Sequence, residues 1–301
     1  MFRKNSGVLV ILVLTLLAAA AQASSPVTLT DTLGREVAIE APVRRIVALQ
    51  PSDVEILFAI GAGDLLVGRG QYCDYPAEAL AIPSVQSGFE TNIEQIIALR
   101  PDLLIMTTMN QRPEDAEKLS EAGIPVLVTQ AETIAEVYGV IRLLGQAVQR
   151  EDEAATLDAG MRAAFAEIAE KAEGREGASA YYEVSPLEYG LWAAGAGTFM
   201  DEIGAMVNLR NVFGDVEGFA AVSEEQVLAR DPDVIVTTAM YFGMGLPPKE
   251  EVMARAGWQG VAAVREGRVF NASADAITRP GPRLTQAAEE LYDFLYGAAE
   301  R

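Results

Sequence analysis

The sequence predicts an α/β protein of two similar lobes around a helical middle, and three observations support this prediction. Short apolar runs typical of buried strands alternate with amphipathic runs typical of helices, both before and after the middle of the chain. Residues 133–174 are almost wholly helix-forming and contain no proline. The stretch NIEQIIALRPDLLI, which begins at Asn92, is similar to SEEQVLARDPDVIV, which begins at Ser223, and we call these two stretches the echo units.

Each copy of the echoed stretch predicts a helix, a turn and a buried strand. A short amphipathic run is broken by Pro-Asp, and a run of aliphatic residues follows. Proline ends a helix, and a strand inside a parallel sheet is apolar on both faces. Aligning Glu94 with Glu225 matches Glu, Gln, Ala, Pro and Asp. We therefore expect the same structural unit once in each lobe.

The elements of the N-terminal lobe follow the order expected of an open parallel sheet. Residues 28–39 form two alternating runs around Leu-Gly, which predict a β-hairpin. Strands are predicted at 44–49, 65–70 and 124–129 in addition to the strand of the first echo, and helices after Pro51 and at 113–123.

The helical middle has two interpretations: two packing helices divided near Gly145, or one long helix that connects the lobes. Gly174 is expected to end it. In the C-terminal lobe we expect a strand at 178–184, a glycine-rich turn and helix at 194–206, the second echo, a strand at 268–273 and a terminal helix at 282–297. The predicted domains are a signal peptide (1–23), an N-terminal lobe (24–132), a helical connector (133–175) and a C-terminal lobe (176–301).

The first 23 residues have the pattern of a cleavable secretory signal peptide. A short positive segment precedes an apolar core, and Ala21-Gln22-Ala23 is a small-x-small cleavage signal. Arg3 and Lys4 are the only charged residues in this segment, so its removal changes the net charge from −20 to −22. We expect an exported, periplasmic protein, and so acidic a chain repels nucleic acid.

The composition argues against most familiar catalytic sites. The chain has no histidine, which excludes His-based triads and most zinc sites, and its single cysteine, Cys73, excludes an internal disulfide. No base that would activate Cys73 is evident, so we interpret it as a small buried residue. AGAGTF, which begins at Ala194, lacks the Lys-Ser/Thr of a nucleotide loop. We predict no metal site, no intrinsic cofactor and no enzyme, with an exported α/β enzyme that works without histidine as the less favoured alternative.

Aromatic residues gather in the predicted loops and indicate a broad pocket between the lobes. Loops at the carboxyl ends of parallel strands are where ligands bind, and aromatic side chains there suit a large, flat ligand. Edge-of-core packing is the alternative for each residue taken alone. The predicted ligand contacts are Tyr72, Phe89, Trp192, Tyr241 and Phe242, with Asp275 and Arg279 as polar contacts.

These motifs together resemble the periplasmic substrate-binding proteins of ABC importers that carry cobalamin, ferric siderophores and haem. The resemblance covers essentially the whole mature chain. RRIVALQPSDVEILFAIGAGDLLVG and the two echo units mark the family, while YCDYP, AGAGTF and TRPGPR are most similar to the vitamin B12 (corrinoid) binders. The resemblance implies a class III periplasmic binding protein fold, in which one long rigid helix joins the lobes and the ligand lies between them.

The resemblance also assigns a role to the echoed glutamates. In this family one glutamate on each lobe pairs with arginines of the membrane permease, and these fall on Glu94 and Glu225; stabilisation of a helix N-terminus is the alternative reading. Tyr72 and Asp275 match ligand contacts of the corrinoid binders. One tryptophan of those binders falls near Gly88, where this chain offers only the adjacent Phe89, and another falls at Thr107. We expect a monomer that binds a cobalt corrinoid; the alternatives are a ferric siderophore, with Arg69, Arg112 and Arg279 as candidate contacts, or haem.

Overall fold

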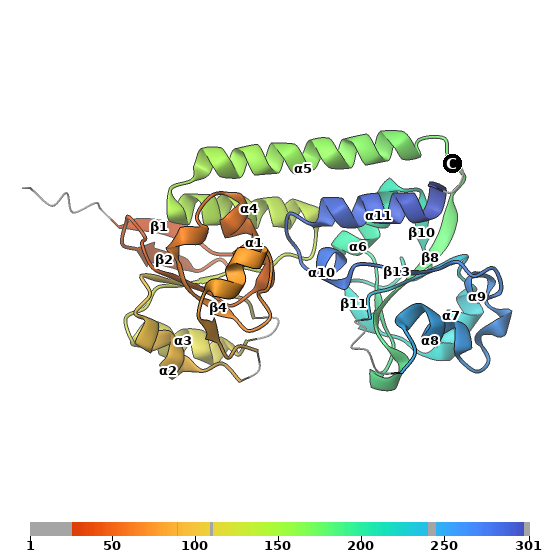
Figure 1. Cartoon of the computed structure of the whole chain (residues 1–301), viewed down its shortest axis with the longest axis horizontal. Helices are drawn as coiled ribbons and strands as arrows, with labels where there is room; N and C mark the ends of the chain where they lie inside the picture. Colours follow the sequence, from red (N-terminus) through yellow and green to blue (C-terminus); the bar gives the residue numbers. More distant parts are fainter. Residues whose placement is uncertain (1–25, 89, 109–110, 240–244, 298–301) are drawn as a thin grey trace, which may run out of the picture.

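The computed structural model describes residues 26–88, 90–108, 111–239 and 245–297. It consists of two α/β lobes joined by helices that lie along one side of both (Figure 1). The predicted signal peptide lies outside the described residues. No helix in the described ranges has the length and the apolar character that a membrane crossing requires.

The N-terminal lobe contains a five-stranded parallel sheet in the order β5-β4-β3-β6-β7. Beside it lies the predicted hairpin. The strands are β1 (Val27–Thr30), β2 (Glu36–Ile39), β3 (Ile46–Ala48), β4 (Leu66–Gly70), β5 (Ser84–Val85), β6 (Leu103–Met106) and β7 (Val126–Val128), and the helices are α1 (Pro51–Ala59), α2 (Ile93–Leu99) and α3 (Pro113–Glu121). Each strand and helix predicted for this lobe is present.

The C-terminal lobe contains a mixed six-stranded sheet in which β10, β8, β12 and β13 are parallel. Its strands are β8 (Ala178–Ser185), β9 (Trp192–Ala194), β10 (Leu209–Asn211), β11 (Phe219–Ala221), β12 (Val234–Thr237) and β13 (Val269–Asn271). Its helices are α6 (Phe199–Met206), α7 (Glu224–Arg230), α8 (Pro248–Ala254), α9 (Ala262–Arg265), α10 (Ala274–Ile277) and α11 (Leu284–Tyr296). The antiparallel strands β9 and β11 were not predicted.

The first glycine of AGAGTF, Gly195, allows the close packing of this antiparallel edge. The Gly195 amide donates to the Gly218 carbonyl oxygen over 2.8 Å, and a Cβ on Gly195 would lie 2.1 Å from the Val216 oxygen. Only glycine permits so close a backbone approach. The glycine-rich turn is therefore explained by packing between two chain segments.

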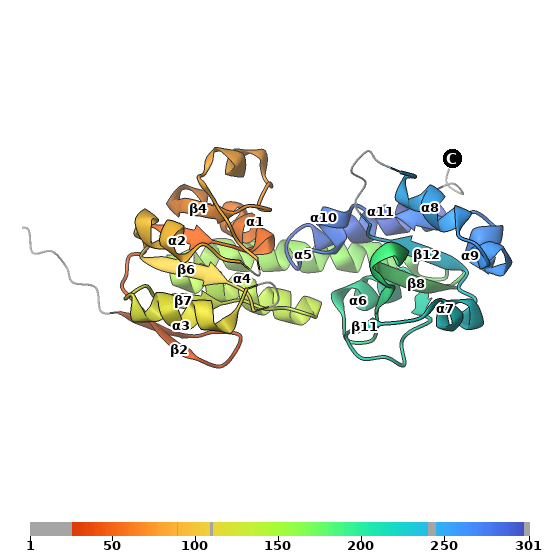
Figure 2. The same cartoon turned by 90° about the horizontal axis from the view of Figure 1, so that it is seen from below.

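The helical middle is two helices, α4 (Ile134–Val148) and α5 (Glu151–Ala172). The chain turns at Gln149, which adopts the left-handed conformation. Gly145 lies inside α4 and not between the helices. Glycine is needed there because α5 packs closely: a Cβ on Gly145 would lie 2.6 Å from the Ala154 side chain. α4 packs on α1 of the N-terminal lobe, and α5 runs on to pack against α6 and α11 of the C-terminal lobe. α5 is thus the helix that connects the lobes, about 33 Å long at 1.5 Å per residue (Figure 2).

One hydrophobic core runs through both lobes. It includes Ile46 and Ile105 of the N-terminal sheet, Phe165 of α5, and Val236 and Leu291 of the C-terminal lobe. A second cluster lies on the other face of the N-terminal sheet, and a third lies on the other face of the C-terminal sheet. A continuous core through the connector favours a fixed orientation of the lobes.

The two echo units have the same local structure. α2 and α7 each begin after a side-chain cap, Asn92 or Ser223, and each is followed by a left-handed residue and a proline. The aspartate after each proline accepts equivalent hydrogen bonds in the two lobes. Asp102 accepts from the backbone amides of Arg44 and Arg45 before β3, and Asp233 accepts from the amide and hydroxyl of Ser179 in β8. The Pro-Asp pair thus ties each unit to the start of a neighbouring strand.

Candidate ligand-binding site and docking helices

A cavity of about 920 Å³ lies between loops of the N-terminal lobe and the segment around α10 of the C-terminal lobe. The N-terminal contribution comes from segments that follow β3, β4, β5 and β6, so the cavity lies at the carboxyl edge of the parallel sheet, where α/β folds place ligands. Three predicted ligand contacts, Tyr72, Asp275 and Arg279, line this cavity together. Tyr72 is 66% exposed, so its ring is open to a ligand.

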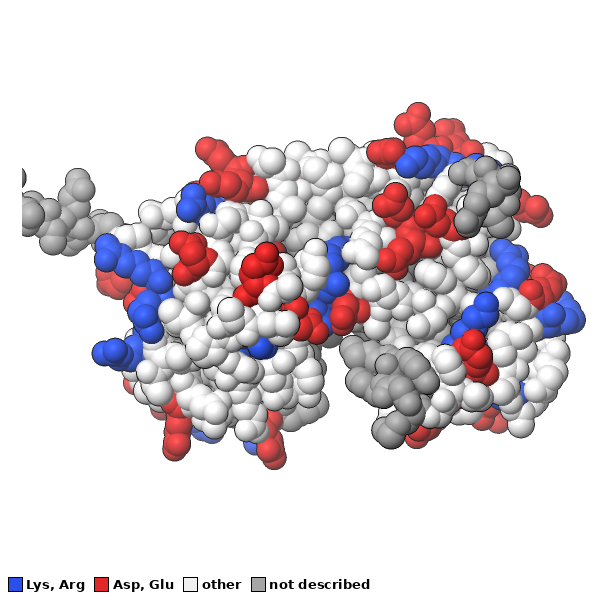
Figure 3. All heavy atoms as spheres, viewed as in Figure 1, with Lys and Arg blue, Asp and Glu red and all other residues white. Residues whose placement is uncertain are grey.

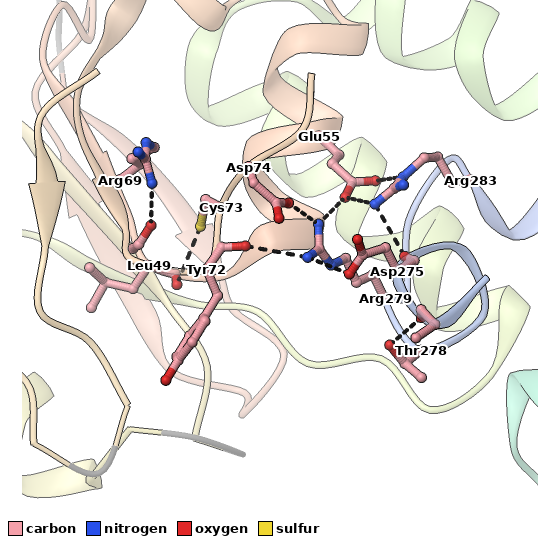
Figure 4. Close-up of polar contacts among 12 residues, drawn as sticks. Leu49, Glu55, Arg69, Tyr72, Cys73, Asp74, Asp275, Thr278, Arg279 and Arg283 are labelled. Atoms are coloured by element: carbon pink, nitrogen blue, oxygen red, sulfur yellow. Dashed lines mark hydrogen bonds and ion pairs between the residues drawn. The ribbon is translucent and has the colours of Figure 1, made fainter. Parts of the chain in front are cut away.

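A cluster of charged side chains joins the two lobes at this cavity (Figure 4). Glu55 of α1 is buried and accepts two hydrogen bonds from Arg283, at 2.7 and 2.9 Å, and one from Arg279 at 3.2 Å. Arg279 also pairs with Asp74 of the N-terminal lobe at 2.7 Å and with Asp275 at 2.6 Å. The Arg283 guanidinium lies 4.2 Å from the centre of the Tyr75 ring. We call Glu55, Asp74, Asp275, Arg279 and Arg283 the inter-lobe cluster.

The charges of this cluster are satisfied within it. Burial alone would lower the pKa of Arg279, but its carboxylate partners raise it. Partial burial alone would raise the pKa of Asp74, but the hydrogen bond and the charge of Arg279 outweigh it, so the pKa is lowered. Arg279 was predicted as a polar contact for the ligand; its guanidinium is already bound to three carboxylates, so its main structural role is to tie the lobes together.

The other predicted ligand contacts are placed differently. Trp192 begins β9, is 42% exposed and does not line the cavity described above. Phe89, Tyr241 and Phe242 lie outside the described residues. Gly88 and Glu90, which flank Phe89, both line the cavity.

Neither of the other arginines considered for an anionic chelate lines the cavity. Arg69 is buried, and its Nε donates to the Ala79 carbonyl oxygen at 2.9 Å. Arg112 precedes α3 and is exposed. Arg279 is therefore the cation among the described lining residues, and its charge is already paired.

Cys73 is buried beneath the cavity wall. Its Sγ lies 3.7 Å from the Leu49 carbonyl oxygen, and burial raises the pKa of its thiol to about 12. A thiol so far from ionisation is a packing residue. Within the described ranges, no group of three or more Cys, Asp or Glu residues is arranged to hold a metal ion.

The echoed glutamates are exposed on two equivalent helices. Glu94 and Glu225 are each the second residue of a seven-residue helix, α2 or α7, and the two helices lie on different lobes away from α5 (Figure 1). Hydrogen bonds from Ser223 and its own backbone lower the pKa of Glu225, so it is ionised at neutral pH. Its neighbour Glu224 accepts a hydrogen bond from the buried Trp258 indole at 2.8 Å and is half-buried, so Glu225 is the more exposed of the two carboxylates.

Each glutamate has an exposed aliphatic side chain three residues further on. Ile97 is 42% exposed and Leu228 is 36% exposed, while the residues before them, Ile96 and Val227, are fully buried. Positions three apart lie on the same face of a helix. Both lobes therefore present a carboxylate and an aliphatic side chain together on an open helix face.

Sequence reasoning missed Glu55, Arg283 and the glutamines of the cavity. Glu55 stands alone in the apolar run VEILFAI, and a charge inside such a run is a signal of a buried pair. Gln50 and Gln71 each follow a predicted strand directly, which is a signal that they lie at the carboxyl edge of the sheet, whereas Gln86 follows β5, which was not predicted.

A family model described as "Periplasmic binding protein" matches residues 46–276. An ABC transporter substrate-binding lipoprotein of Bacillus subtilis, described as uncharacterized, is 34% identical over 277 residues, which cover 90% of this chain and 86% of that protein. The crystal structure of the periplasmic vitamin B12 binding protein of Vibrio cholerae has a TM-score of 0.71 and 28% identity, covering 86% of this chain and 99% of that one.

A second solved structure with the same fold is an ABC-type Fe3+-hydroxamate transport system protein of Saccharomonospora viridis, with a TM-score of 0.74 and 28% identity over 90% of this chain and 99% of that one. Haem-binding proteins such as that of Roseiflexus (TM-score 0.74, 24% identity, covering 85% of this chain and 99% of that one) share the fold alone. The relatives are substrate-binding proteins of transport systems and not enzymes. The two-lobe fold and the matches along the chain agree, and the chain belongs to the periplasmic binding protein family.

Proposed function

We propose that this chain is the exported substrate-binding component of an ABC importer, which captures a corrinoid in the cavity between its lobes and delivers it to a membrane permease. The observation that supports this most directly is the 920 Å³ cavity at the carboxyl edge of the N-terminal sheet, which is lined by Tyr72 and by Asp74, Asp275 and Arg279 of the inter-lobe cluster. This volume is near the upper end of the range for small-molecule sites, roughly 300–1,000 Å³. A large ligand such as a corrinoid therefore suits it.

The choice of a corrinoid rests on the likeness to the vitamin B12 binding protein of Vibrio cholerae and on Tyr72 and Asp275 in the cavity. Phe89, Trp192, Tyr241 and Phe242 remain proposed contacts. The ligand is cargo, and no resident cofactor is proposed. The alternative cargo is a ferric hydroxamate siderophore, which the likeness to the Saccharomonospora viridis protein favours.

Delivery is proposed to use both echo helices. Glu94 and Glu225 would each pair with a basic side chain of the permease, while Ile97 and Leu228 would cover apolar surface beside it. Two such points, one on each lobe, fix the orientation of a monomer on a two-fold partner. The net charge of −20 suits a basic partner and repels nucleic acid; on the face shown in Figure 3, acidic and basic side chains are both spread over the surface. Export through the segment 1–23 would place the protein in the periplasm.

A calorimetric titration of the chain from Ser24 tests the cargo. Saturable one-to-one binding of cyanocobalamin is expected, and cobinamide, which lacks the lower nucleotide, reports whether that group contributes. Absence of heat with both ligands, together with saturable binding of a ferric hydroxamate, would replace the corrinoid by the alternative cargo. Tyr72→Ala should weaken binding about 10-fold, since stacking on an aromatic ring contributes about 0.5–1.5 kcal/mol beyond the buried area.

A further inference from the structure

Four glutamines line the cavity, and each comes from a segment that follows a different parallel strand. Gln50 follows β3, Gln71 follows β4, Gln86 follows β5, and Gln111 comes after β6. Since neighbouring strands lie about 4.8 Å apart, glutamines that follow four strands form a row of carboxamides along one wall. We call these four residues the glutamine row.

Three of the four carboxamides of this row are available to a ligand. The side chains of Gln50, Gln71 and Gln86 form no hydrogen bond with any other described residue. Gln111 is buried, and its Oε1 accepts from the Thr107 amide at 3.0 Å, which fixes its orientation. A carboxamide both donates and accepts, so a row of them matches a ligand that carries amide or carbonyl groups of its own.

The charge of the cavity also disfavours an anionic ligand. The carboxylates of Asp74, Glu90 and Asp275 face it, whereas Arg279 is the cation among the described lining residues. The Glu55–Arg283 pair behind them adds no net charge. The wall is therefore net negative, and the guanidinium that an anionic ligand would need is already bound to three carboxylates.

We infer that the cavity selects neutral or cationic metal chelates that carry peripheral amide groups, read by the glutamine row, and rejects chelates that carry carboxylate or catecholate charge. This inference rests on the proposed function and narrows its cargo. Corrinoids, with their peripheral carboxamides, and ferric hydroxamates belong to the accepted class. Haem, with two propionates, and a ferric tricatecholate, with three negative charges, belong to the rejected class.

The first test compares ligands of different charge by calorimetry on the chain from Ser24. Cyanocobalamin is expected to bind, cationic cobinamide at least as tightly, and a cyanocobalamin derivative with one propionamide hydrolysed to a carboxylate roughly 10-fold more weakly, because the added charge faces a negative wall. Haemin and the ferric tricatecholate should show no saturable binding. Tighter binding of haemin or of the tricatecholate than of both corrinoids would overturn the inference.

The outcome separates this inference from the proposed function. Should neither corrinoid bind, the cationic ferric hydroxamate ferrioxamine B decides between the two claims. Its binding, with rejection of the tricatecholate, keeps the amide-bearing class and removes the corrinoid. If no amide-bearing chelate binds, both the inference and the proposal of a corrinoid cargo are overturned.

The second test removes amides from the row. Gln71→Leu and Gln86→Leu should each weaken the bound amide-bearing chelate about 3- to 10-fold, the size expected for one lost neutral hydrogen bond. Both residues are exposed, so the fold should be retained, and the thermal midpoint checks this. Gln146→Leu, on an exposed position of α4 outside the cavity, is the matched control and should leave affinity unchanged. Unchanged affinity in both row variants would refute the role of the row.

Discussion

The two lobes are alike where they pack and where they are proposed to dock, and they differ where the ligand cavity lies. Both contain the same helix–turn–strand unit, tied to a neighbouring strand by Asp102 in one lobe and Asp233 in the other. Both present an exposed glutamate and an exposed aliphatic residue on that unit. Yet the described wall of the cavity comes mainly from the N-terminal lobe, with Asp275, Thr278 and Arg279 as the contribution of the other.

This difference separates the two tasks of the molecule. If the permease has two equivalent halves, as proposed, it requires the same surface on both lobes, and the repeated docking unit supplies it. An asymmetric ligand has no such requirement, and the loops that follow each strand are free to diverge because they carry little of the core. In the proposed account, selectivity belongs to loops such as those of Gln71 and Gln86, and docking belongs to α2 and α7.

The junction between the lobes gives the largest expected effect on stability. Glu55→Ala leaves Arg279 and Arg283 without their shared buried carboxylate. Removing one partner of a buried ion pair costs about 3–5 kcal/mol, so the free energy of unfolding should fall by about 4 kcal/mol in a urea titration. Glu153→Ala breaks an exposed pair with Arg150 and should change it by less than about 0.5 kcal/mol. Equal effects of the two variants would show that the cluster does not hold the lobes together.

A second difference between the lobes concerns their buried carboxylates. Glu183 of the C-terminal lobe contacts the buried Arg255 at 2.6 Å, whereas Asp53 of the N-terminal lobe has no cationic partner among the described residues and accepts from the Thr129 hydroxyl at 2.7 Å. Burial, partly opposed by the hydrogen bond from Thr129, raises the pKa of Asp53 to about 7.

A raised carboxyl pKa means that the folded state keeps a proton that the unfolded state loses near pH 4. This proton contributes stability at low pH that is lost as the pH rises toward 7, by about 2.5 kcal/mol between pH 5 and pH 7.5. Asp53→Asn, which stays neutral and can still accept from Thr129, should remove that loss in urea titrations at the two pH values. The exposed Asp64→Asn is the control and should keep the wild-type dependence. An unchanged dependence in Asp53→Asn would show that Asp53 is ionised in the folded protein.

The smallest effect is expected from the aliphatic residues of the docking helices. Ile97→Ser and Leu228→Ser should each weaken binding to the permease about 5-fold, since covering a partly exposed aliphatic side chain contributes about 1 kcal/mol. Equal losses would support equivalent docking points on the two lobes, and Ala98→Ser is a control on the same helix as Ile97. A loss confined to one lobe, measured by binding to permease in nanodiscs, would contradict the equivalence.

Much of the fold could be predicted because the local patterns agree with one another. The hairpin, the two echo units and the parallel strands other than β5 and β10 follow from periodicity and from proline and glycine positions. The edge pair β9–β11 could not be predicted, since WAAGAG has no alternating pattern and its pairing with Phe219–Ala221 depends on the close approach of Gly195 to the segment 216–218. For the helical middle, the sequence allowed two interpretations because the turn at Gln149 contains neither glycine nor proline.

The site was harder to predict than the fold. Tyr72, Asp275 and Arg279 were found from loop position and resemblance, and they do lie together at the cavity. The partners of Arg279 were not predictable, because Glu55 is 224 residues away in the chain and only the fold brings it within 3.2 Å. Asp275 was expected in a loop and lies in the short helix α10, since the last strand is followed at once by a helical turn.

Delivery through two equivalent glutamates is the central claim, and transport into proteoliposomes that contain the cognate permease tests it most directly. The double variant Glu94→Lys, Glu225→Lys should abolish corrinoid uptake, while its affinity for cyanocobalamin stays within about two-fold of the wild type, because both residues lie outside the cavity. Uptake at the wild-type rate in the double variant would contradict the account, and so would a loss of ligand affinity in parallel with uptake.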